Sequence, residues 1–227
     1  MYMKIKHHSI FNNLNSDQIN WNIIRNDPNE KEYFIPIEKS EYIKEASSQK
    51  SYKEIISEIL FILNDFKIKT IFSLGSGRAY LEYGLKQKNI SIQISDSDAS
   101  MDRIKAFKIF DTVYKLSFNE VLTKVKNFKG LILMSRIDTE LSDDELIEMF
   151  DSLAKNKIKH IFFIPAQLLT FRSFFIEIYL RIKSRLFKKK LVFCGYSRSK
   201  NLLIRLWGNH YTTYQTKNSK SFLLELR

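Results

Sequence analysis

The sequence predicts an α/β protein with a doubly wound, mostly parallel sheet of seven strands that ends in an antiparallel hairpin. Short apolar runs alternate with helix-period segments from residue 51 to residue 166, as expected for a parallel sheet and its covering helices. The last two strand-like runs, 210–216 and 221–227, are separated by only four residues. A crossover helix does not fit in four residues, so these two runs form a hairpin.

The elements follow in a regular order along the chain. Residues 51–66 place six apolar side chains on one helical face, and Ser51 with Glu54 has the spacing of a capping box. Residues 68–74 form an apolar run that ends at a glycine, which predicts a buried parallel strand that leads into a helix over 75–88. The same alternation predicts strands at 90–95, 111–118, 130–135 and 158–166, and helices at 98–107, 119–128 and 142–156, the last with Ser142 and Glu145 as a capping box.

Composition limits the chain to one large core, with a small appendage at most. The 227 residues are 44% hydrophobic and include only six glycines and three prolines, which leaves little material for flexible linkers. A single cysteine, Cys194, excludes an internal disulfide, and the N-terminal residues lack the apolar core of a signal peptide. No uninterrupted apolar run reaches the length of a membrane span. We therefore expect a cytoplasmic protein.

The net charge is strongly positive. Thirty-seven Lys and Arg against 25 Asp and Glu give +12, which favours anionic partners such as nucleic acid, anionic lipid or a phosphorylated substrate. A lysine-rich composition also arises from the base bias of a genome. The charge alone does not choose between these explanations.

The stretch "FSLGSGRA", residues 72–79, holds two of the six glycines. It follows the first predicted strand, where a glycine-rich turn lets a ligand approach the backbone. Tyr80 stands at the third glycine of a G-x-G-x-x-G dinucleotide motif, and no G-K-[ST] follows. The turn therefore matches neither the dinucleotide fingerprint nor a P-loop.

These residues resemble the first motif of the class I S-adenosylmethionine-dependent methyltransferases, a Rossmann-like family with an apolar strand, an acidic residue and G-x-G-x-G. Gly75 and Gly77 match the motif, Ala79 replaces the last glycine and Ser73 replaces the acid. The resemblance implies that the turn wraps the methionine end of S-adenosylmethionine. The alternative is a purely structural role, a tight strand-to-helix turn that binds no ligand.

A second matching feature is Asp96, which lies 21 residues after Gly75 at the end of the next strand. The resemblance implies that this carboxylate accepts hydrogen bonds from the two ribose hydroxyls of the cofactor, with Asp98 as the runner-up; Asp96 could otherwise cap the following helix. The implied cofactor residues are Ser73, Gly75, Ser76, Gly77, Ala79, Asp96 and Ser97.

The resemblance covers about residues 50–227. It implies a methyltransferase domain at 51–227 and an N-terminal segment at 1–50 that acts as a lid on the substrate side. Tyr33, Tyr42 and Tyr52 could shield a sulfonium by cation–π contact, and core packing explains them equally well.

Catalytic candidates are sought beyond the carboxyl ends of the central strands, where ligands of open α/β sheets bind. Arg136, Asp138, Gln167 and His210 follow or precede these strands. His210 is the natural base for a hydroxyl acceptor because histidine titrates near neutral pH. Asp138 orients the acceptor or caps a helix. No metal site is predicted.

Residues 171–190 predict an amphipathic helix with a basic end. Its apolar face consists of Phe171, Phe174, Phe175, Ile178, Ile182 and Leu186. Three interpretations remain open: an ordinary helix packed on the sheet, a helix that lies on an anionic membrane, or part of a phosphate-contacting patch for RNA. RNA is the less favoured partner because the chain contains no separate RNA-binding module.

The sequence therefore favours a methyltransferase that transfers the methyl group of S-adenosylmethionine to a small-molecule, glycan-linked or lipid-linked acceptor, at an oxygen atom. The alternatives are an RNA methyltransferase that uses the basic C-terminal half, and a non-catalytic binding subunit with the same fold.

Overall fold

The structure is a computed structural model that describes residues 5–7, 21–30, 33–166, 168–187, 195–216 and 220–227. Seven strands form one sheet in the order β4-β3-β2-β5-β6-β9-β8. They are β2 (Thr70–Leu74), β3 (Ser91–Asp96), β4 (Thr112–Lys115), β5 (Leu131–Ser135), β6 (His160–Ile164), β8 (Tyr211–Gln215) and β9 (Phe222–Leu226). Strands β2 to β6 are parallel, whereas β9 is antiparallel to both β6 and β8. The predicted sheet and terminal hairpin are confirmed.

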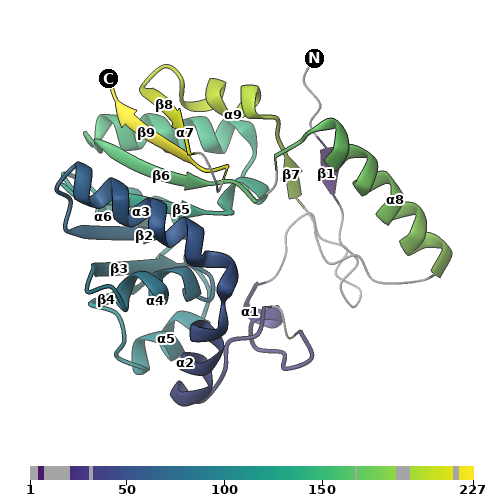
Figure 1. Ribbon diagram of the computed structural model, residues 1–227, viewed down its shortest axis with the longest axis horizontal. Helices are drawn as coiled ribbons and strands as arrows, with labels where there is room; N and C mark the ends of the chain where they lie inside the picture. Colours follow the sequence, from purple (N-terminus) through teal and green to yellow (C-terminus); the bar gives the residue numbers. More distant parts are fainter. Residues whose placement is uncertain (1–4, 8–20, 31–32, 167, 188–194, 217–219) are drawn as a thin grey trace.

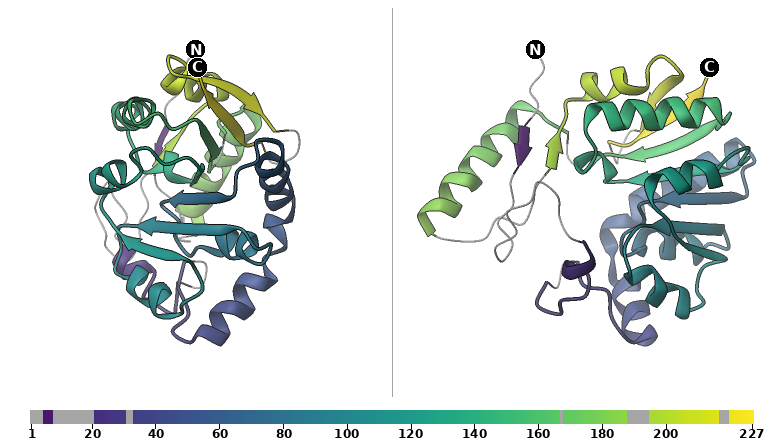
Figure 2. Two further views of the ribbon diagram at one scale, coloured as in Figure 1. Left: turned by 90° about the vertical axis from the view of Figure 1, so that its left-hand side faces the viewer. Right: turned by 180° about the vertical axis from the view of Figure 1, so that it is seen from behind.

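Helices cover both faces of the sheet (Figures 1 and 2). One face packs against α2 (Lys39–Ser48), α3 (Lys53–Asp65), α4 (Tyr80–Lys86) and α5 (Ser100–Ala106), and the other against α6 (Phe118–Lys124), α7 (Asp143–Lys155) and α9 (Lys200–Trp207). Strand side chains alternate between the two cores: Ile71 lies in the first, and Phe72 lies in the second. The sheet is therefore buried on both sides.

The helix starts differ in part from the sequence prediction. Ser142 and Glu145 form the predicted capping box at α7. The capping box of Ser51 is wrong, because Lys50–Tyr52 forms a 3₁₀ turn that runs directly into α3. A capping box that the sequence reading missed, Ser117 with Glu120, begins α6, so β4 is shorter than predicted.

The N-terminal part of the chain contains two helices that the sequence analysis missed, α1 (Trp21–Ile24) and α2. Ile35, Tyr42 and Ala46 are buried in the same core as α3, α4 and α5. These residues pack as part of the main domain, and the division of the chain at residue 50 stays a prediction.

Helix α8 (Phe171–Phe187) extends away from the sheet, beside a two-stranded ribbon of β1 (Ile5–His7) and β7 (Gly195–Ser197), as Figures 1 and 2 show. Its Phe171 and Leu186 side chains are 83% and 72% exposed. The interpretation as a helix packed on the sheet is therefore wrong. In the described part of the chain, no helix has the length and apolar character to span a bilayer.

The order of the strands changes direction between β2 and β5. The chain proceeds from β2 outward to β3 and β4, and then returns to β5 on the other side of β2. Ligands of open α/β sheets bind at such a switch point, beyond the carboxyl ends of the strands.

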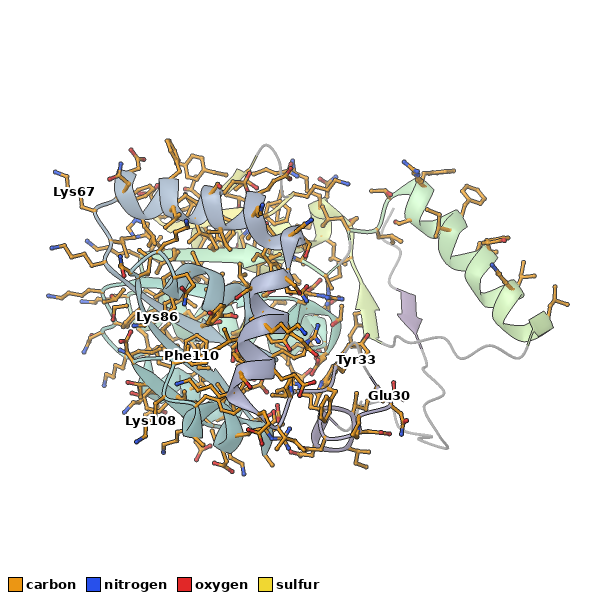
Figure 3. The ribbon with its side chains drawn as sticks, turned by 60° about the horizontal axis from the view of Figure 1, so that its bottom comes forward. Glu30, Tyr33, Lys67, Lys86, Lys108 and Phe110 are labelled. Carbon is orange, nitrogen blue, oxygen red and sulfur yellow. The ribbon has the colours of Figure 1, made fainter. Side chains whose placement is uncertain are left out.

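Figure 3 shows Tyr33 on one side of the domain and Lys67, Lys86 and Lys108 projecting from the opposite side.

Candidate functional site

A pocket of about 290 Å³ lies at the carboxyl ends of β2, β3 and β5. Three parts of the sheet domain form its walls: the glycine turn and the start of α4, the end of β3, and the loop after β5. Trp21, Arg25 and Tyr33 close it from the N-terminal segment. The pocket thus occupies the switch point of the sheet.

The glycine turn needs left-handed backbone at three positions. Gly75 and Gly77 have φ of +64° and +58°, and a Cβ at Gly75 would lie 2.6 Å from Ile137 Cγ2. Ala79, which stands at the third glycine of the family motif, also has a left-handed φ of 54°. A non-glycine residue in this region has a strain of about 1–2 kcal/mol. The turn therefore keeps the backbone path of the motif without its last glycine.

Asp96 lies at the end of β3 and faces the glycine turn. The backbone N–H of Gly77 donates to Asp96 Oδ2 at 2.8 Å, and the N–H of Ser97 donates to Oδ1 at 2.8 Å. The N–H of Ser76 donates to the Ser95 carbonyl at 3.0 Å. The two bonds to Asp96 hold its carboxylate against the turn, and its role at a ribose stays a prediction.

Arg25 covers this carboxylate. Its Nη1 lies 3.3 Å from Asp96 Oδ2 and also pairs with Asp98 Oδ2, and both Arg25 and Asp98 are buried. The Trp21 ring stacks on the guanidinium at 4.8 Å. We call Arg25, Asp96 and Asp98 the arginine–aspartate cluster. Sequence reasoning missed Arg25, because residues around it carry neither a motif nor a clear periodicity.

Ser73 and Glu82 form a second polar contact in the same wall. Ser73 is fully buried in β2 and its Oγ donates to Glu82 Oε1 at 2.6 Å. Glu82, from α4, lines the pocket and is 2% exposed. Burial raises the pKa of Glu82 to about 7, against the lowering effect of the Ser73 hydrogen bond. The sequence feature that could have pointed to Glu82 is a carboxylate within the otherwise apolar run "YLEYGL", residues 80–85.

Two of the predicted catalytic residues lie in the loop after β5, and only one of them lines the pocket. Arg136 lines the pocket, with a left-handed φ of 64°. Asp138 is fully buried behind the wall, where its Oδ1 accepts the Ala166 N–H at 3.0 Å and its carbonyl accepts from the Arg198 guanidinium. Burial raises the pKa of Asp138 to about 6. Asp138 thus joins the loops after β5 and β6 and does not line the pocket.

His210 does not lie at the site. It immediately precedes β8, whose first residue, Tyr211, pairs with Leu226 in β9, and Glu225 in turn pairs with His160 at the start of β6. The hairpin register therefore places His210 at the amino ends of the parallel strands. The prediction that it lies beyond their carboxyl ends is wrong. Its Nε2 contacts Asp151 Oδ1 at 2.8 Å, and Gln167 lies outside the described residues.

The tyrosines of the N-terminal half divide between two roles. Tyr33 and Tyr52 line the pocket. Tyr42 is fully buried, and its hydroxyl donates to the Arg78 carbonyl at 2.9 Å, so it supports the glycine turn from behind. Within the described residues, no group of His, Cys, Asp and Glu has an arrangement that could hold a metal ion.

Solved structures share this fold at low sequence identity. A putative methyltransferase from Thermobifida fusca YX is 11% identical with a TM-score of 0.51, over 85% of this chain and 84% of that one. The PH0226 protein from Pyrococcus horikoshii OT3 is 12% identical with a TM-score of 0.53, over 80% and 93% of the two chains. Human N-acetylserotonin methyltransferase, solved in complex with S-adenosylmethionine, is 11% identical with a TM-score of 0.50, over 83% and 56%.

No family model and no curated protein matches the sequence. The assignment therefore rests on the architecture. The chain has the fold of the class I S-adenosylmethionine-dependent methyltransferases.

Proposed function

We propose that the protein is an S-adenosylmethionine-dependent methyltransferase. The observation that carries this proposal is the carboxylate of Asp96, held against the left-handed turn of Gly75 and Gly77 in the wall of a pocket. The pocket also offers a polar atom that lacks a partner: Ser76 Oγ is buried without a hydrogen bond in the described structure. These groups fit the polar parts of the cofactor.

In this proposal the residues on the two sides of the pocket have different roles. The turn from Gly75 to Ala79 contacts the methionine end, and Asp96 and Ser97 lie at the ribose. Bound S-adenosylmethionine supplies a methyl group on a positively charged sulfur. The protein orients the acceptor and excludes water, which are the main requirements of such a transfer. Trp21, Tyr33 and Tyr52 close the pocket and serve the second requirement.

We propose an oxygen acceptor that is already deprotonated, such as a carboxylate. Histidine is absent from the pocket lining in the described part of the chain, whereas Arg136 lines it at the end of β5. A guanidinium binds a carboxylate through paired hydrogen bonds, and a carboxylate needs no general base before methyl transfer. The acceptor class is therefore a small acid, either free or linked to a glycan or lipid.

Transfer of labelled methyl groups tests the function and the acceptor together. The purified protein is incubated with methyl-labelled S-adenosylmethionine and a panel of carboxylic acids, with the matching amides as controls. We expect label in the acids alone, and its release as volatile methanol in base, because esters hydrolyse and ethers or methylamines do not. Base-stable label would contradict the carboxylate acceptor. No transfer to any acceptor class would contradict the enzyme.

We also propose that the protein is cytoplasmic and contacts an anionic membrane surface through α8. Five exposed apolar side chains follow one helical face: Phe171, Phe175, Ile178, Ile182 and Leu186. Arg172 and Lys183 are also exposed on α8. Lys188, Lys189 and Lys190 follow in sequence, outside the described residues. Exposed apolar and basic side chains on one helix suit the interface of an anionic bilayer.

Vesicle sedimentation tests the membrane contact. The double variant Phe171→Ser/Phe175→Ser is compared with Phe61→Ser, which removes from α3 a phenylalanine whose exposure lies between those of Phe171 and Phe175. We expect binding to vesicles with anionic lipid, loss of binding in the double variant and no loss in Phe61→Ser. A concentration-dependent dimer without vesicle binding would instead identify α8 as a contact between two copies of the chain.

A further inference from the structure

Glu82 is a buried carboxylate that lacks a cationic partner. Its Oε1 accepts the Ser73 hydroxyl, and no Lys, Arg or His in the described residues forms an ion pair with it. Two of the three arginines that line the pocket make other contacts: Arg25 pairs with the aspartates, and Arg78 stacks on the Tyr80 ring at 4.4 Å. Burial of an unpaired charge is unfavourable. A ligand cation would remove this penalty.

We propose that Glu82, held in place by Ser73, is the subsite for the ammonium group of the ligand's amino-acid moiety. The proposal rests on the proposed function and names one residue of its cofactor site. Glu82 faces the pocket from α4, one turn beyond the glycine turn, and Ser73 lies beneath it in β2. An acid carried by α4 thus replaces the acid that the family motif carries at position 73.

The other carboxylates near the pocket do not serve this role as well. Glu140 also lines the pocket, but it interacts with the charge of Arg25. The arginine–aspartate cluster already holds its own cation, so an ammonium there would have to displace Arg25. Asp138 lies behind the wall and does not line the pocket. Glu82 therefore lies where an ammonium can pair with a carboxylate without breaking an existing ion pair.

The subsite couples ligand binding to a proton. The pKa of Glu82 is about 7 without a cation, and a bound ammonium lowers it, because opposite charges favour the ionised form. The affinity for a ligand with an ammonium group should therefore rise about tenfold between about pH 6 and about pH 8, with release of a proton on the acid side of this range. A ligand without that group should show no such rise.

The experiment compares two probes by calorimetric titration. S-adenosylhomocysteine carries the amino-acid moiety, and methylthioadenosine carries the same nucleoside without it. Titrations at about pH 6 and about pH 8, in buffers with different heats of ionisation, give both affinity and protons released. We expect Glu82→Gln to lose about tenfold or more in affinity for S-adenosylhomocysteine at high pH, the usual scale for a lost charged hydrogen bond, and to lose the pH dependence. Methylthioadenosine binding should stay unchanged.

Two further variants control for structural effects. Glu45→Gln removes another carboxylate that accepts a hydroxyl hydrogen bond, from Tyr80 at 2.6 Å, and that lies outside the pocket lining, so it should behave like the wild type. Ser73→Asp combined with Glu82→Gln should restore affinity for S-adenosylhomocysteine, because it returns a carboxylate to the same wall.

The outcomes separate this proposal from the function it rests on. Equal, pH-independent binding of S-adenosylhomocysteine by the wild type and Glu82→Gln would overturn the ammonium subsite and leave the methyltransferase proposal intact. Loss of both probes in Glu82→Gln would assign Glu82 a purely structural role and overturn the subsite as well. If the wild type binds neither probe, both proposals are overturned.

Discussion

Two of the acidic sites at the pocket, that of Asp96 and that of Glu82, differ in how their charge is balanced. Asp96 and Asp98 share the guanidinium of Arg25, whereas Glu82 has no ion pair with a cation in the described residues and accepts hydrogen bonds from neutral groups, among them the Ser73 hydroxyl. The first site has its balancing cation within the protein. A ligand that hydrogen-bonds to Asp96 must therefore displace part of the contact between Arg25 and Asp96. The second site is incomplete until a cation arrives. Equal burial of carboxylates therefore does not imply equal function.

The same difference applies to stability. A buried ion pair contributes little net stability, but removal of one partner leaves an uncompensated charge. Glu82 is already in that uncompensated state whenever it is ionised. Binding sites commonly reduce the stability of the protein in this way, so substitutions at the two sites should have opposite effects on folding.

The largest expected effect follows loss of the cation at the complete site. Arg25→Met leaves the Asp98 carboxylate, 2% exposed, without its partner. We expect a loss of about 3–5 kcal/mol in the free energy of unfolding, measured by urea denaturation near neutral pH. Lys115→Met breaks an exposed pair with Asp102 and should change stability by at most about 1 kcal/mol. Similar small losses in both variants would contradict the role of Arg25.

The next effect has the opposite sign. The pKa of Glu82 is about 7 in the folded protein, above its ordinary value of 4.5, so the folded state holds the proton to higher pH and stability falls as pH rises between these values. Glu82→Gln removes this penalty and should stabilise the ligand-free protein by about 3 kcal/mol above pH 7. The gain should vanish near pH 4.5. Urea denaturation across this pH range measures it, and a destabilised variant at high pH would contradict the account.

A smaller effect concerns the turn between the two sites. Ala79 has a left-handed φ of 54°, which glycine adopts without strain, so Ala79→Gly should stabilise the protein by about 1 kcal/mol. The control Ala154→Gly lies inside α7, where glycine should destabilise by about the same amount. Thermal unfolding of both variants measures the pair. A destabilised Ala79→Gly would show that the alanine methyl contributes more by packing than its backbone strain removes.

The smallest effect is expected far from the pocket. His210 and Asp151 form a pair whose side chains are 37% and 40% exposed, so His210→Asn should change stability by less than about 1 kcal/mol. Methyl transfer should stay unchanged, because the residue lies at the opposite edge of the sheet from Asp96. A large loss of transfer rate with normal cofactor affinity would return His210 to the list of catalytic residues.

The sequence predicts the frame of the site well, because strand and helix periodicity encode the sheet. The glycine turn and Asp96 belong to that frame, and their spacing follows from one strand–helix–strand unit. Arg25 and Glu82 are different. Arg25 reaches Asp96 across about seventy residues of chain, and Glu82 acquires its meaning only from burial beside Ser73. Neither contact leaves a periodic pattern in the sequence.

His210 illustrates a second limit. The prediction correctly placed two strands in a hairpin. Each of these strands, however, has one end beside the amino ends of the parallel strands and the other beside their carboxyl ends. Which end of β8 lies near the pocket depends on strand order and direction. Because β9 lies between β6 and β8 and is antiparallel to both, β8 is parallel to β6 and begins at the amino ends of the parallel strands. A strand prediction fixes the type of element and leaves its direction in the sheet open.

Calorimetric titration of the wild-type protein with S-adenosylmethionine and S-adenosylhomocysteine, repeated with Asp96→Ala, shows whether this pocket is a cofactor site. We expect micromolar binding of both ligands by the wild type, and a loss of about 1–3 kcal/mol in binding free energy for Asp96→Ala, as expected for hydrogen bonds to a charged acceptor. Absence of binding to the folded wild-type protein, or equal binding by Asp96→Ala, would contradict the proposed cofactor site.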